Sequence, residues 1–374
     1  MRVAYIGQKG IPATFGGVEY HVDKLSREMA AQGHDVTVYV RSWYTPKELK
    51  EYEGVRLVHV PTIKSKHLDA SVHSFLCSVH ALFGKFDIIH YHGIGPAFFA
   101  IIPRLFGKKV VATVHRLDWE TEKWKSIAKR LLKAGEHIAI TVPDRTIAVS
   151  EELTRYVKNK YDKVVIHLGH GTDLPQSLDP AIIKAKYDLN RGDYILFMGR
   201  LVPEKRVDWL IRAFQDLKGR PSESSSLKLV IAGGSSATPE YVKKLEDMSE
   251  GSSDILFTGY VTGAEKEELF SNARLFSLPS HLEGFPIALL EAKSYGLCCL
   301  VSDIPPHVEA IRSGVNGLLF RSDDFEDLRQ KLQELIDDHD TLKKLGANAR
   351  EEMNNLPGWK IVVKKIESIY EELL

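Results

Sequence analysis

The chain has 374 residues, of which 44% are hydrophobic and 27% charged, and its 50 basic side chains equal its 50 acidic ones. This composition is typical of a globular protein, the balanced charge argues against a nucleic-acid-binding protein, and the length exceeds the size at which one hydrophobic core stops growing. The three cysteines show no Cys-x-x-Cys spacing, which excludes the usual zinc and disulfide patterns. No run of about 18 apolar residues predicts a membrane span, and no signal peptide is expected because Met1-Arg2 leads directly into a strand-like run.

The two halves of the chain differ in charge. Residues 1–175 hold 25 basic and 18 acidic side chains, whereas the remainder holds 25 and 32, so the net charges are +7 and −7. This asymmetry predicts that one domain faces an anionic partner.

Short apolar runs alternate with helix-like stretches along the first half. Residues 3–7 form the first run, and after a glycine-rich loop an amphipathic helix continues until Gly33 ends it. Further strands are expected at 36–40, 55–60, 87–91, 110–114, 146–149 and 164–167, with helices at 71–83, 96–106 and 123–140. Strands that alternate with helices predict βαβ units and a parallel sheet.

The same alternation restarts at residues 194–198. The remaining strands are expected at 227–232, 255–258, 275–278, 298–302 and 318–320, with helices at 207–217, 240–249, 264–272, 287–295 and within 325–353. Residues 168–192, rich in glycine and proline, are the expected linker, and 219–226 an expected mobile loop. The prediction is an α/β protein of two facing doubly wound Rossmann-like domains, 1–175 and 176–356, with an interdomain cleft.

The most informative stretch is 280–292, where an apolar strand leads through a glycine turn into a helix that is expected to have Pro286 at its first position. The backbone N–H groups at that helix start form an anion site. Glu283 in the turn and Glu291 on the helix could both line a cleft there and bind sugar hydroxyls. The alternative is a solvated loop glutamate and a glutamate that caps a helix start.

Two further loops follow predicted strands. Arg200 and Lys205 come after strand 194–198 and could clamp a diphosphate, as a planar fork and a point charge respectively. Gly16 and Gly17 precede a helix and could hold a phosphate or let backbone approach a sugar, although the spacing is not a dinucleotide fingerprint. The alternatives are exposed loop charges and a plain tight turn.

Histidines mark two strand ends in the first half. His90 and His92 lie on one face of a strand, and His115 closes another. Because the sequence offers no evident third ligand, no metal site is predicted. We expect His92 to face the cleft and bind an acceptor; structural histidines are the alternative.

Together the Gly16-Gly17 pair, Arg200 with Lys205, and the Glu283-x7-Glu291 spacing resemble the retaining nucleotide-sugar glycosyltransferases of family 4. These enzymes have the two-Rossmann GT-B architecture. The likeness covers the whole chain.

Two other segments extend this resemblance. The final helix, within 357–374, would cross back onto the first domain, as in other GT-B enzymes. The opening, residues 10–19, resembles the bacterial envelope-polysaccharide branch, which includes rhamnosyltransferases.

The resemblance implies a role for each candidate residue. The first domain would bind the acceptor and the second the nucleotide-sugar donor. The implied catalytic residues are Arg200, Lys205, Glu283 and His115; the donor-binding residues are Gly16, Gly17, Tyr260, Gly284, Phe285, Pro286, Ile287 and Glu291; and the acceptor-binding residues are His92 and Arg116. No cofactor is expected, because the nucleotide sugar is a substrate and Arg200 and Lys205 would replace a metal ion.

Three departures from the family pattern bear on these roles. Arg116 stands where relatives tend to have glycine, which affects the acceptor pocket. Residues 168–172 depart from the usual linker sequence. Pro286 replaces a frequent glycine and removes one amide from the central turn.

The implied activity is transfer of a hexose, with retention, to a lipid-linked or polysaccharide acceptor in cell-envelope glycan synthesis. The alternatives are a nucleotide-sugar epimerase, a phosphorylase-like enzyme on the same fold, and a non-catalytic protein that binds sugar nucleotides.

Residues 104–133 carry nine basic side chains, against only three acidic ones, and interleave them with tryptophan, isoleucine and leucine. The pattern predicts a helix that lies on an anionic bilayer, which would place a cytoplasmic protein at the inner face of the plasma membrane. The alternative is that the apolar stripe packs on the sheet and the lysines are solvated. No nucleic acid partner is expected.

Overall fold

The computed structural model describes the chain except residues 64, 66–67, 122–125, 219–225 and 236–237. It divides into two compact units. The N-terminal unit comprises Met1–Gly171 and Pro357–Leu374, and the C-terminal unit comprises Thr172–Leu356. The first unit thus ends just before the predicted boundary at 175/176. The predicted mobile loop, 219–226, falls almost wholly outside the described residues.

The N-terminal unit is built on an eight-stranded sheet in the order β3-β4-β2-β1-β5-β6-β7-β8. Its strands are β1 (Arg2–Ile6), β2 (Asp35–Val40), β3 (Glu51–Tyr52), β4 (Val55–His59), β5 (Ile88–His92), β6 (Lys109–Val114), β7 (Arg145–Ala148) and β8 (Ile166–His167). The strands pair in parallel except for β3 with β4, which are antiparallel. The central strands are buried, as expected for a parallel sheet that helices cover on both faces, and β5 buries His90 and His92 among its apolar residues.

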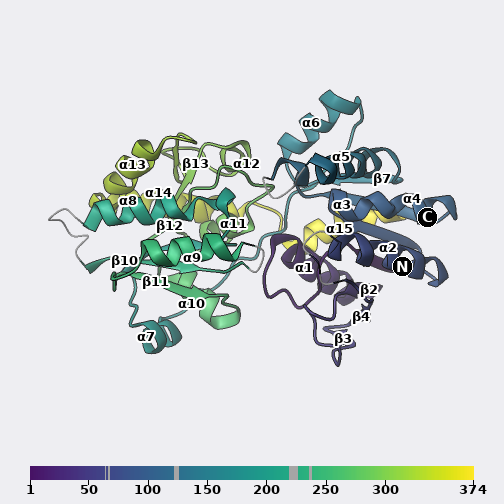
Figure 1. Cartoon of the computed structure of the whole chain (residues 1–374), viewed down its shortest axis with the longest axis horizontal. Helices are drawn as coiled ribbons and strands as arrows, with labels where there is room; N and C mark the ends of the chain where they lie inside the picture. The colour runs from purple at the N-terminus through teal and green to yellow at the C-terminus, as the bar shows by residue number, and fades with distance from the viewer. Residues whose placement is uncertain (64, 66–67, 122–125, 219–225, 236–237) are drawn as a thin grey trace. The chain divides into compact units, whose positions relative to one another are not determined.

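Helices flank this sheet (Figure 1). They are α1 (Gly17–Ala31), α2 (Asp69–Phe83), α3 (Ile94–Ala97), α4 (Ile101–Leu105), α5 (Ser126–Thr141), α6 (Glu151–Tyr161) and α15 (Trp359–Glu371), with 3₁₀ turns η1 (Phe98–Ala100) and η2 (Asp118–Glu120). The helix predicted over 96–106 is present but starts at Ile94, and the 3₁₀ turn η1 interrupts its α-helical hydrogen bonding between α3 and α4. Pro103 has no backbone N–H to continue a regular ladder there, which accounts for the interruption.

The C-terminal unit contains a six-stranded parallel sheet in the order β11-β10-β9-β12-β13-β14. Its strands are β9 (Tyr194–Met198), β10 (Lys228–Ala232), β11 (Ile255–Gly259), β12 (Leu275–Leu278), β13 (Cys299–Ser302) and β14 (Leu318–Phe320). Its helices are α7 (Ala181–Tyr187), α8 (Val207–Lys218), α9 (Pro239–Met248), α10 (Gly263–Asn272), α11 (Ile287–Ser294), α12 (Pro305–Ala310), α13 (Phe325–Asp337) and α14 (His339–Asn354), with the 3₁₀ turn η3 (Pro203–Lys205).

The predicted linker, 168–192, is more ordered than its composition suggests. Helix α7 lies within it, and the buried Glu268 carboxylate accepts hydrogen bonds from the backbone N–H groups of Ile182 and Ile183 at 2.7 and 3.0 Å. A side chain from α10 therefore caps α7, which local sequence could not reveal.

In both units the strand order reverses beside the first strand, with β1 next to β5 and β9 next to β12. Such a reversal is the topological switch point at which doubly wound sheets bind ligands. The prediction of two Rossmann-like α/β domains is confirmed.

The last helix, α15, packs in the N-terminal unit, where the yellow α15 lies among purple and blue elements (Figure 1). Its buried face, which includes Val362, Ile366 and Tyr370, joins the core formed by β1, β2 and α1. Gly171, where the chain leaves the unit, lies against Trp359, where the chain has just returned, and a Cβ on Gly171 would come within 2.7 Å of the Trp359 Cα. No helix within the described residues is long and apolar enough to cross a membrane.

Candidate functional site

The loops after β9 and β12 meet at the switch point of the C-terminal unit. Arg200 is the second residue after β9, Lys205 ends η3, and Glu283 lies in the turn between β12 and α11. The His281 backbone N–H donates to the Glu204 carbonyl at 3.0 Å and ties the two loops together. The fold thus brings three of the predicted catalytic residues to the carboxyl edge of neighbouring strands.

Lys205 and Glu283 form an ion pair in which the side chains are only 15% and 9% exposed. The Ser280 hydroxyl donates a second hydrogen bond to the same carboxylate oxygen at 2.7 Å. Burial alone would raise the pKa of Glu283, but the Lys205 ammonium and these hydrogen bonds hold that pKa below its ordinary value. Glu283 is therefore a carboxylate at neutral pH, and an ammonium and a carboxylate stand side by side at the switch point.

Glu291, in the second turn of α11, has a different lysine partner. Lys266 on α10 donates to its carboxylate at 2.6 Å, and each side chain keeps about a fifth of its surface exposed. The two predicted carboxylates thus stand on one strand–turn–helix segment with separate counter-charges, and Glu291 is the more accessible of the two.

Pro286 is not the first residue of the helix, as the sequence suggested. Its ψ of 93° is extended, so it is the N-cap of α11, which starts at Ile287. The Pro286 carbonyl accepts from the Leu289 and Leu290 N–H groups at 3.0 and 3.3 Å, which accounts for two of the donors at the helix start. Gly284, Phe285 and Ile287 are half-buried beside it.

Tyr260 follows β11, two strands from β9 on the side away from β12, and it lies near Arg200 in the loop after β9. The Tyr260 hydroxyl donates to the Gly234 carbonyl at 2.7 Å, and 45% of the residue is exposed. Burial raises the pKa of Tyr260 while the Arg200 guanidinium opposes that rise, so the two side chains lie within electrostatic reach. The loops after β9 and β10 also approach each other closely. Gly233 after β10 has a φ of +141° and lies against the Gly199 carbonyl oxygen, so a Cβ at Gly233 would overlap that oxygen.

In the N-terminal unit, Gly16 and Gly17 start α1. Gly16 has a φ of +102°, a backbone conformation that favours glycine, and a Cβ there would also displace the Glu19 carboxylate. Glu19 accepts from the Lys9 N–H and ammonium at 3.1 and 3.0 Å. The glycine-rich loop is thereby folded onto the first turn of its own helix.

His92, at the end of β5, and His115, just after β6, are within hydrogen-bond distance, with Nδ1 and Nε2 3.1 Å apart. Two histidines that the sequence analysis did not single out join them: His21 of α1 and His170, whose Nδ1 atoms are 2.8 Å apart. Burial lowers the pKa of each of the four, in the case of His170 to about 4.

Arg116 is on the rim of this cluster, rather than within it. Its guanidinium donates to Asp118 at 2.7 Å and is about a third exposed. The two predicted acceptor-binding residues therefore differ in solvent exposure, since His92 is fully buried and Arg116 is partly exposed.

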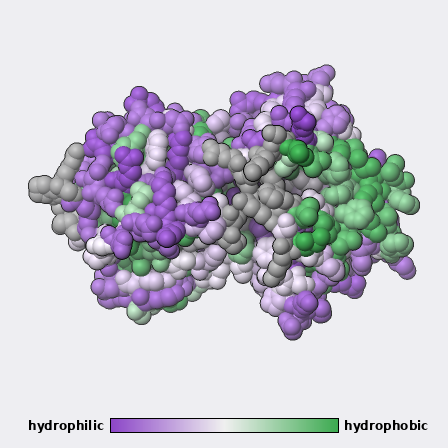
Figure 2. Space-filling view, in the orientation of Figure 1, coloured by the Kyte–Doolittle hydropathy of each residue, from purple (hydrophilic) through white to green (hydrophobic). Residues whose placement is uncertain are grey.

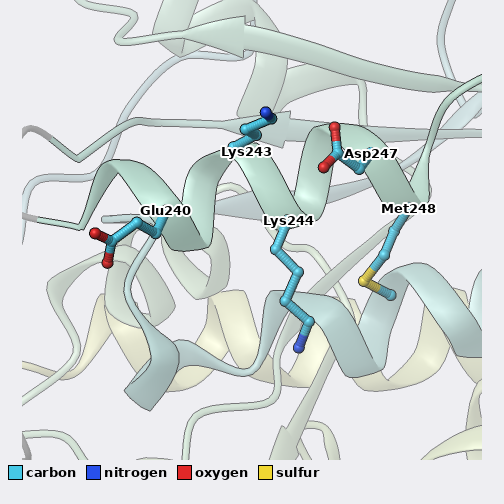
Figure 3. A pocket seen from close by; sticks show the side chains of 5 residues that line it. All are labelled: Glu240, Lys243, Lys244, Asp247 and Met248. Carbon is cyan, nitrogen blue, oxygen red and sulfur yellow. The ribbon is translucent and has the colours of Figure 1, made fainter.

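A separate hollow lies along α9, and all five of the side chains drawn around it belong to that helix (Figure 3). They are Glu240, Lys243, Lys244, Asp247 and Met248. Lys244 is engaged with Asp208 at 2.8 Å, and none of the predicted site residues lines this hollow.

Two family models match the chain. "Glycosyltransferase Family 4" matches residues 15–174 and "Glycosyl transferases group 1" matches residues 181–352. A D-inositol 3-phosphate glycosyltransferase of Frankia alni is 28% identical over 96% of this chain and 95% of its own length.

Solved structures resemble the whole fold. Sucrose-phosphate synthase of Thermosynechococcus elongatus superposes with a TM-score of 0.84 at 20% identity, over 100% of this chain and 98% of that one. Anabaena HepE in complex with UDP-glucose gives a TM-score of 0.80 at 16% identity over 100% of both chains. With one family model on each unit and GT-B folds as its structural neighbours, this chain belongs to the family 4 type of glycosyltransferases.

Proposed function

We propose that the chain transfers a hexose from a nucleoside diphosphate sugar to a lipid-linked or polysaccharide acceptor, with retention of the anomeric configuration. The observation that carries this proposal is the switch-point cluster of the C-terminal unit, where Lys205 pairs with the ionised Glu283 and Arg200 lies in the same loop as Lys205, within electrostatic reach of Tyr260. Cations next to a hydroxyl-binding carboxylate suit a ligand that is at once a diphosphate and a sugar.

The proposed roles follow charge and position. Arg200 and Lys205 stabilise the departing diphosphate, with no metal ion required there. Glu283 binds hydroxyls of the transferred sugar, and the more accessible Glu291 binds the ribose. Tyr260 and its strand end hold the base, while Gly284, Phe285, Pro286 and Ile287 shape the turn next to the phosphates.

The N-terminal unit supplies the acceptor side. Gly16 and Gly17 let backbone approach the diphosphate and the acceptor, Arg116 binds the acceptor, and His115 contacts the donor sugar. His92, which is buried, acts on the acceptor pocket only through its contact with His115. No carboxylate is assigned as a nucleophile. The bond between the anomeric carbon and the phosphate oxygen breaks, the bond to the acceptor oxygen forms on the same face, and the acceptor proton passes to the departing phosphate.

The donor class is tested first by binding. The similarity to HepE, which was solved with UDP-glucose, makes UDP-hexoses the first candidates. The rhamnosyltransferase-like opening adds deoxyhexose nucleotides to the panel. A sugar nucleotide of the right base and sugar should raise the melting temperature by mass action, and mismatched ones should not.

Product analysis then separates the candidate activities. With donor plus acceptor we expect a glycoside of the donor's anomeric configuration, and an inverted product would contradict retention. A new sugar nucleotide from donor alone would indicate an epimerase, and sugar phosphate from phosphate plus glycan would indicate a phosphorylase. Donor binding without product from any acceptor would indicate a non-catalytic binding protein.

An exposed apolar patch on the N-terminal unit supports a lipid-linked acceptor. Phe83 is 86% exposed, Leu105 80% and Ile127 76%, at the ends of α2 and α4 and the start of α5. The packing alternative is therefore wrong for Ile127, whose side chain does not enter the core. Trp124 and Lys125 lie outside the described residues. Figure 2 shows hydrophobic surface gathered over the α2–α4 region.

Basic side chains border the exposed part of α5. Lys129, Arg130 and Lys133 follow Ile127 on this helix, with Lys133 lying over the Trp119 ring at 4.7 Å. Exposed apolar side chains flanked by cations suit the surface of an anionic bilayer. The apolar groups enter the lipid–water interface, and each near-surface cation contributes about 1 kcal/mol to the binding free energy. We therefore propose that this surface docks on the inner face of the cytoplasmic membrane.

Vesicle sedimentation tests this docking. The protein should pellet with anionic vesicles at low salt and be released at high salt. Lys129→Glu/Lys133→Glu should abolish pelleting, whereas the matched control Lys343→Glu/Lys344→Glu, on exposed positions of α14, should not. Equal pelleting of both variants, or pelleting with neutral vesicles alone, would contradict the proposal.

A further inference from the structure

The N-terminal unit contains a buried three-histidine cluster made of His21, His92 and His115. His21 comes from the second turn of α1, His92 from the end of β5, and His115 from the residue after β6. Each side chain is at most 7% exposed. Three elements that are distant in sequence thus bring imidazoles together at the carboxyl edge of neighbouring strands.

The ring nitrogens of this cluster are close enough to share one ion. One nitrogen from each histidine lies within 4.8 Å of the others. Tetrahedral coordination at about 2.1 Å places ligand nitrogens about 3.4 Å apart, so the site closes if the most distant pair approaches by no more than about 1.4 Å. The ammonium of Lys9, on the glycine-rich loop before α1, is neutralised by its ion pair with Glu19.

Hydrogen bonds do not satisfy the cluster. His92 bonds to His115 and His21 to His170 through their Nδ1 atoms. The Nε2 atoms of His21 and His92 have no hydrogen-bond partner in the part of the chain that the structure describes. By contrast, the adjacent His90 uses both nitrogens, to Tyr370 at 2.6 Å and Thr113 at 2.7 Å. A buried polar atom left unpaired is costly, so these two nitrogens point to a missing partner.

We propose that His21, His92 and His115 bind a divalent transition-metal ion of the zinc class. Imidazole-only ligand sets suit Zn²⁺, Co²⁺, Ni²⁺ and Cu²⁺, whereas Mg²⁺ and Ca²⁺ prefer oxygen. His170, which stacks on His115 with ring centroids 6.0 Å apart, or a water occupies the fourth position.

The ion would join α1 to β5 and β6 and fix the start of α1, where Gly16 and Gly17 lie. It would also occupy a nitrogen of His115, so a metal-bound His115 could contact the donor sugar only through its other ring atoms. This inference does not depend on the proposed transferase activity, because it is measured by metal binding alone.

The test uses tag-free, full-length protein freed of metal by chelator and dialysis. Zn²⁺ titration against a chromophoric chelator should give one tight site per chain, and Co²⁺ should give visible d–d absorption. X-ray absorption of the zinc-loaded protein should show at least three imidazole nitrogens at about 2.0–2.1 Å.

Variants identify the ligands. His21→Gln should weaken Zn²⁺ binding at least tenfold and remove the cobalt bands, while His137→Gln, on an exposed histidine of α5, should leave both unchanged. Stoichiometry below one site, equal affinity in His21→Gln, or a zinc shell of oxygen ligands would each overturn the proposal. The X-ray absorption measurement uses the parent protein and decides the matter even if His21→Gln does not fold.

Discussion

The two units have the same strand order around their switch points but bury different polar side chains there. At this edge the N-terminal unit gathers neutral imidazoles, and the C-terminal unit places an ion pair between Lys205 and Glu283. An imidazole can remain buried by giving up its proton, and its lowered pKa records that. A carboxylate kept ionised in the same setting needs a cation beside it. The same topology therefore accommodates buried polar groups in two ways, as neutral imidazoles or as an ion pair, and the two arrangements should respond differently to mutation and pH.

The largest expected effect comes from leaving the buried Glu283 carboxylate of the C-terminal unit without its Lys205 counter-charge. Lys205→Met should destabilise the C-terminal unit by about 3–5 kcal/mol, because an unpaired buried charge remains. Trp209, the only one of the five tryptophans in that unit, reports its unfolding in urea. The double variant Lys205→Met/Glu283→Gln should recover much of the loss. If single and double variants were equally unstable, lost packing rather than charge would be responsible.

A slightly smaller effect should appear in catalysis rather than stability. Arg200→Ala should lower kcat by roughly 10²–10³-fold, about 2.7–4 kcal/mol, because negative charge on the leaving group grows toward the transition state. The donor KM should change much less. Unchanged turnover would remove Arg200 from the mechanism and leave Lys205 as the sole cation at the phosphate.

His307 of α12 combines both kinds of group, because it places a buried imidazole next to the ion pair of the C-terminal unit. Burial lowers its pKa to about 4, although the Glu283 carboxylate opposes this. The unfolded chain, with an ordinary histidine pKa of 6.5, binds more protons between pH 6.5 and 4. Stability from His307 is therefore present above pH 6.5 and is lost as pH falls.

Between pH 7 and pH 5 this loss should reach about 2 kcal/mol, before carboxylates begin to titrate. His307→Gln should show a correspondingly shallower decline, measured by urea unfolding of the Trp209 signal at both pH values. Parallel declines for parent and variant would mean that His307 titrates normally in the folded protein.

The smallest effect should come from Lys266 and Glu291, the more exposed pair of the same unit. Lys266→Met should change the free energy of unfolding by no more than about 1 kcal/mol, because water screens that pair. The comparison with Lys205→Met tests burial directly, since both variants remove a lysine from a glutamate. A loss as large as that of Lys205→Met would show that burial does not separate the two pairs.

Much of this arrangement could be predicted from sequence. The apolar runs 194–198 and 275–278 coincide with β9 and β12, and their position fixed Arg200 and Glu283 at strand ends. The location of charged residues in loops after strands can be predicted, because in a parallel sheet the position of a loop in the sequence determines the edge of the sheet on which it lies.

The histidine cluster could not be predicted in the same way. His21 sits beside Val22 in an ordinary amphipathic helix, and His170 lies in a segment that composition marked as linker. Their meeting depends on how α1 and the end of the N-terminal unit pack. The one available signal was His92 and His115 at the ends of strands that turned out to be neighbours.

The contact between Gly171 and Trp359 has a consequence for biogenesis. The whole C-terminal unit is inserted between two touching points of the N-terminal unit, and the returning α15 completes that unit's core. Domains usually mature in the order of synthesis, N-terminal first. Here the unit that is translated first can finish folding only after α15 leaves the ribosome, so the inserted unit can mature before its host. A nascent chain stalled before residue 357 would expose the apolar surface of β1, β2 and α1 that α15 later covers.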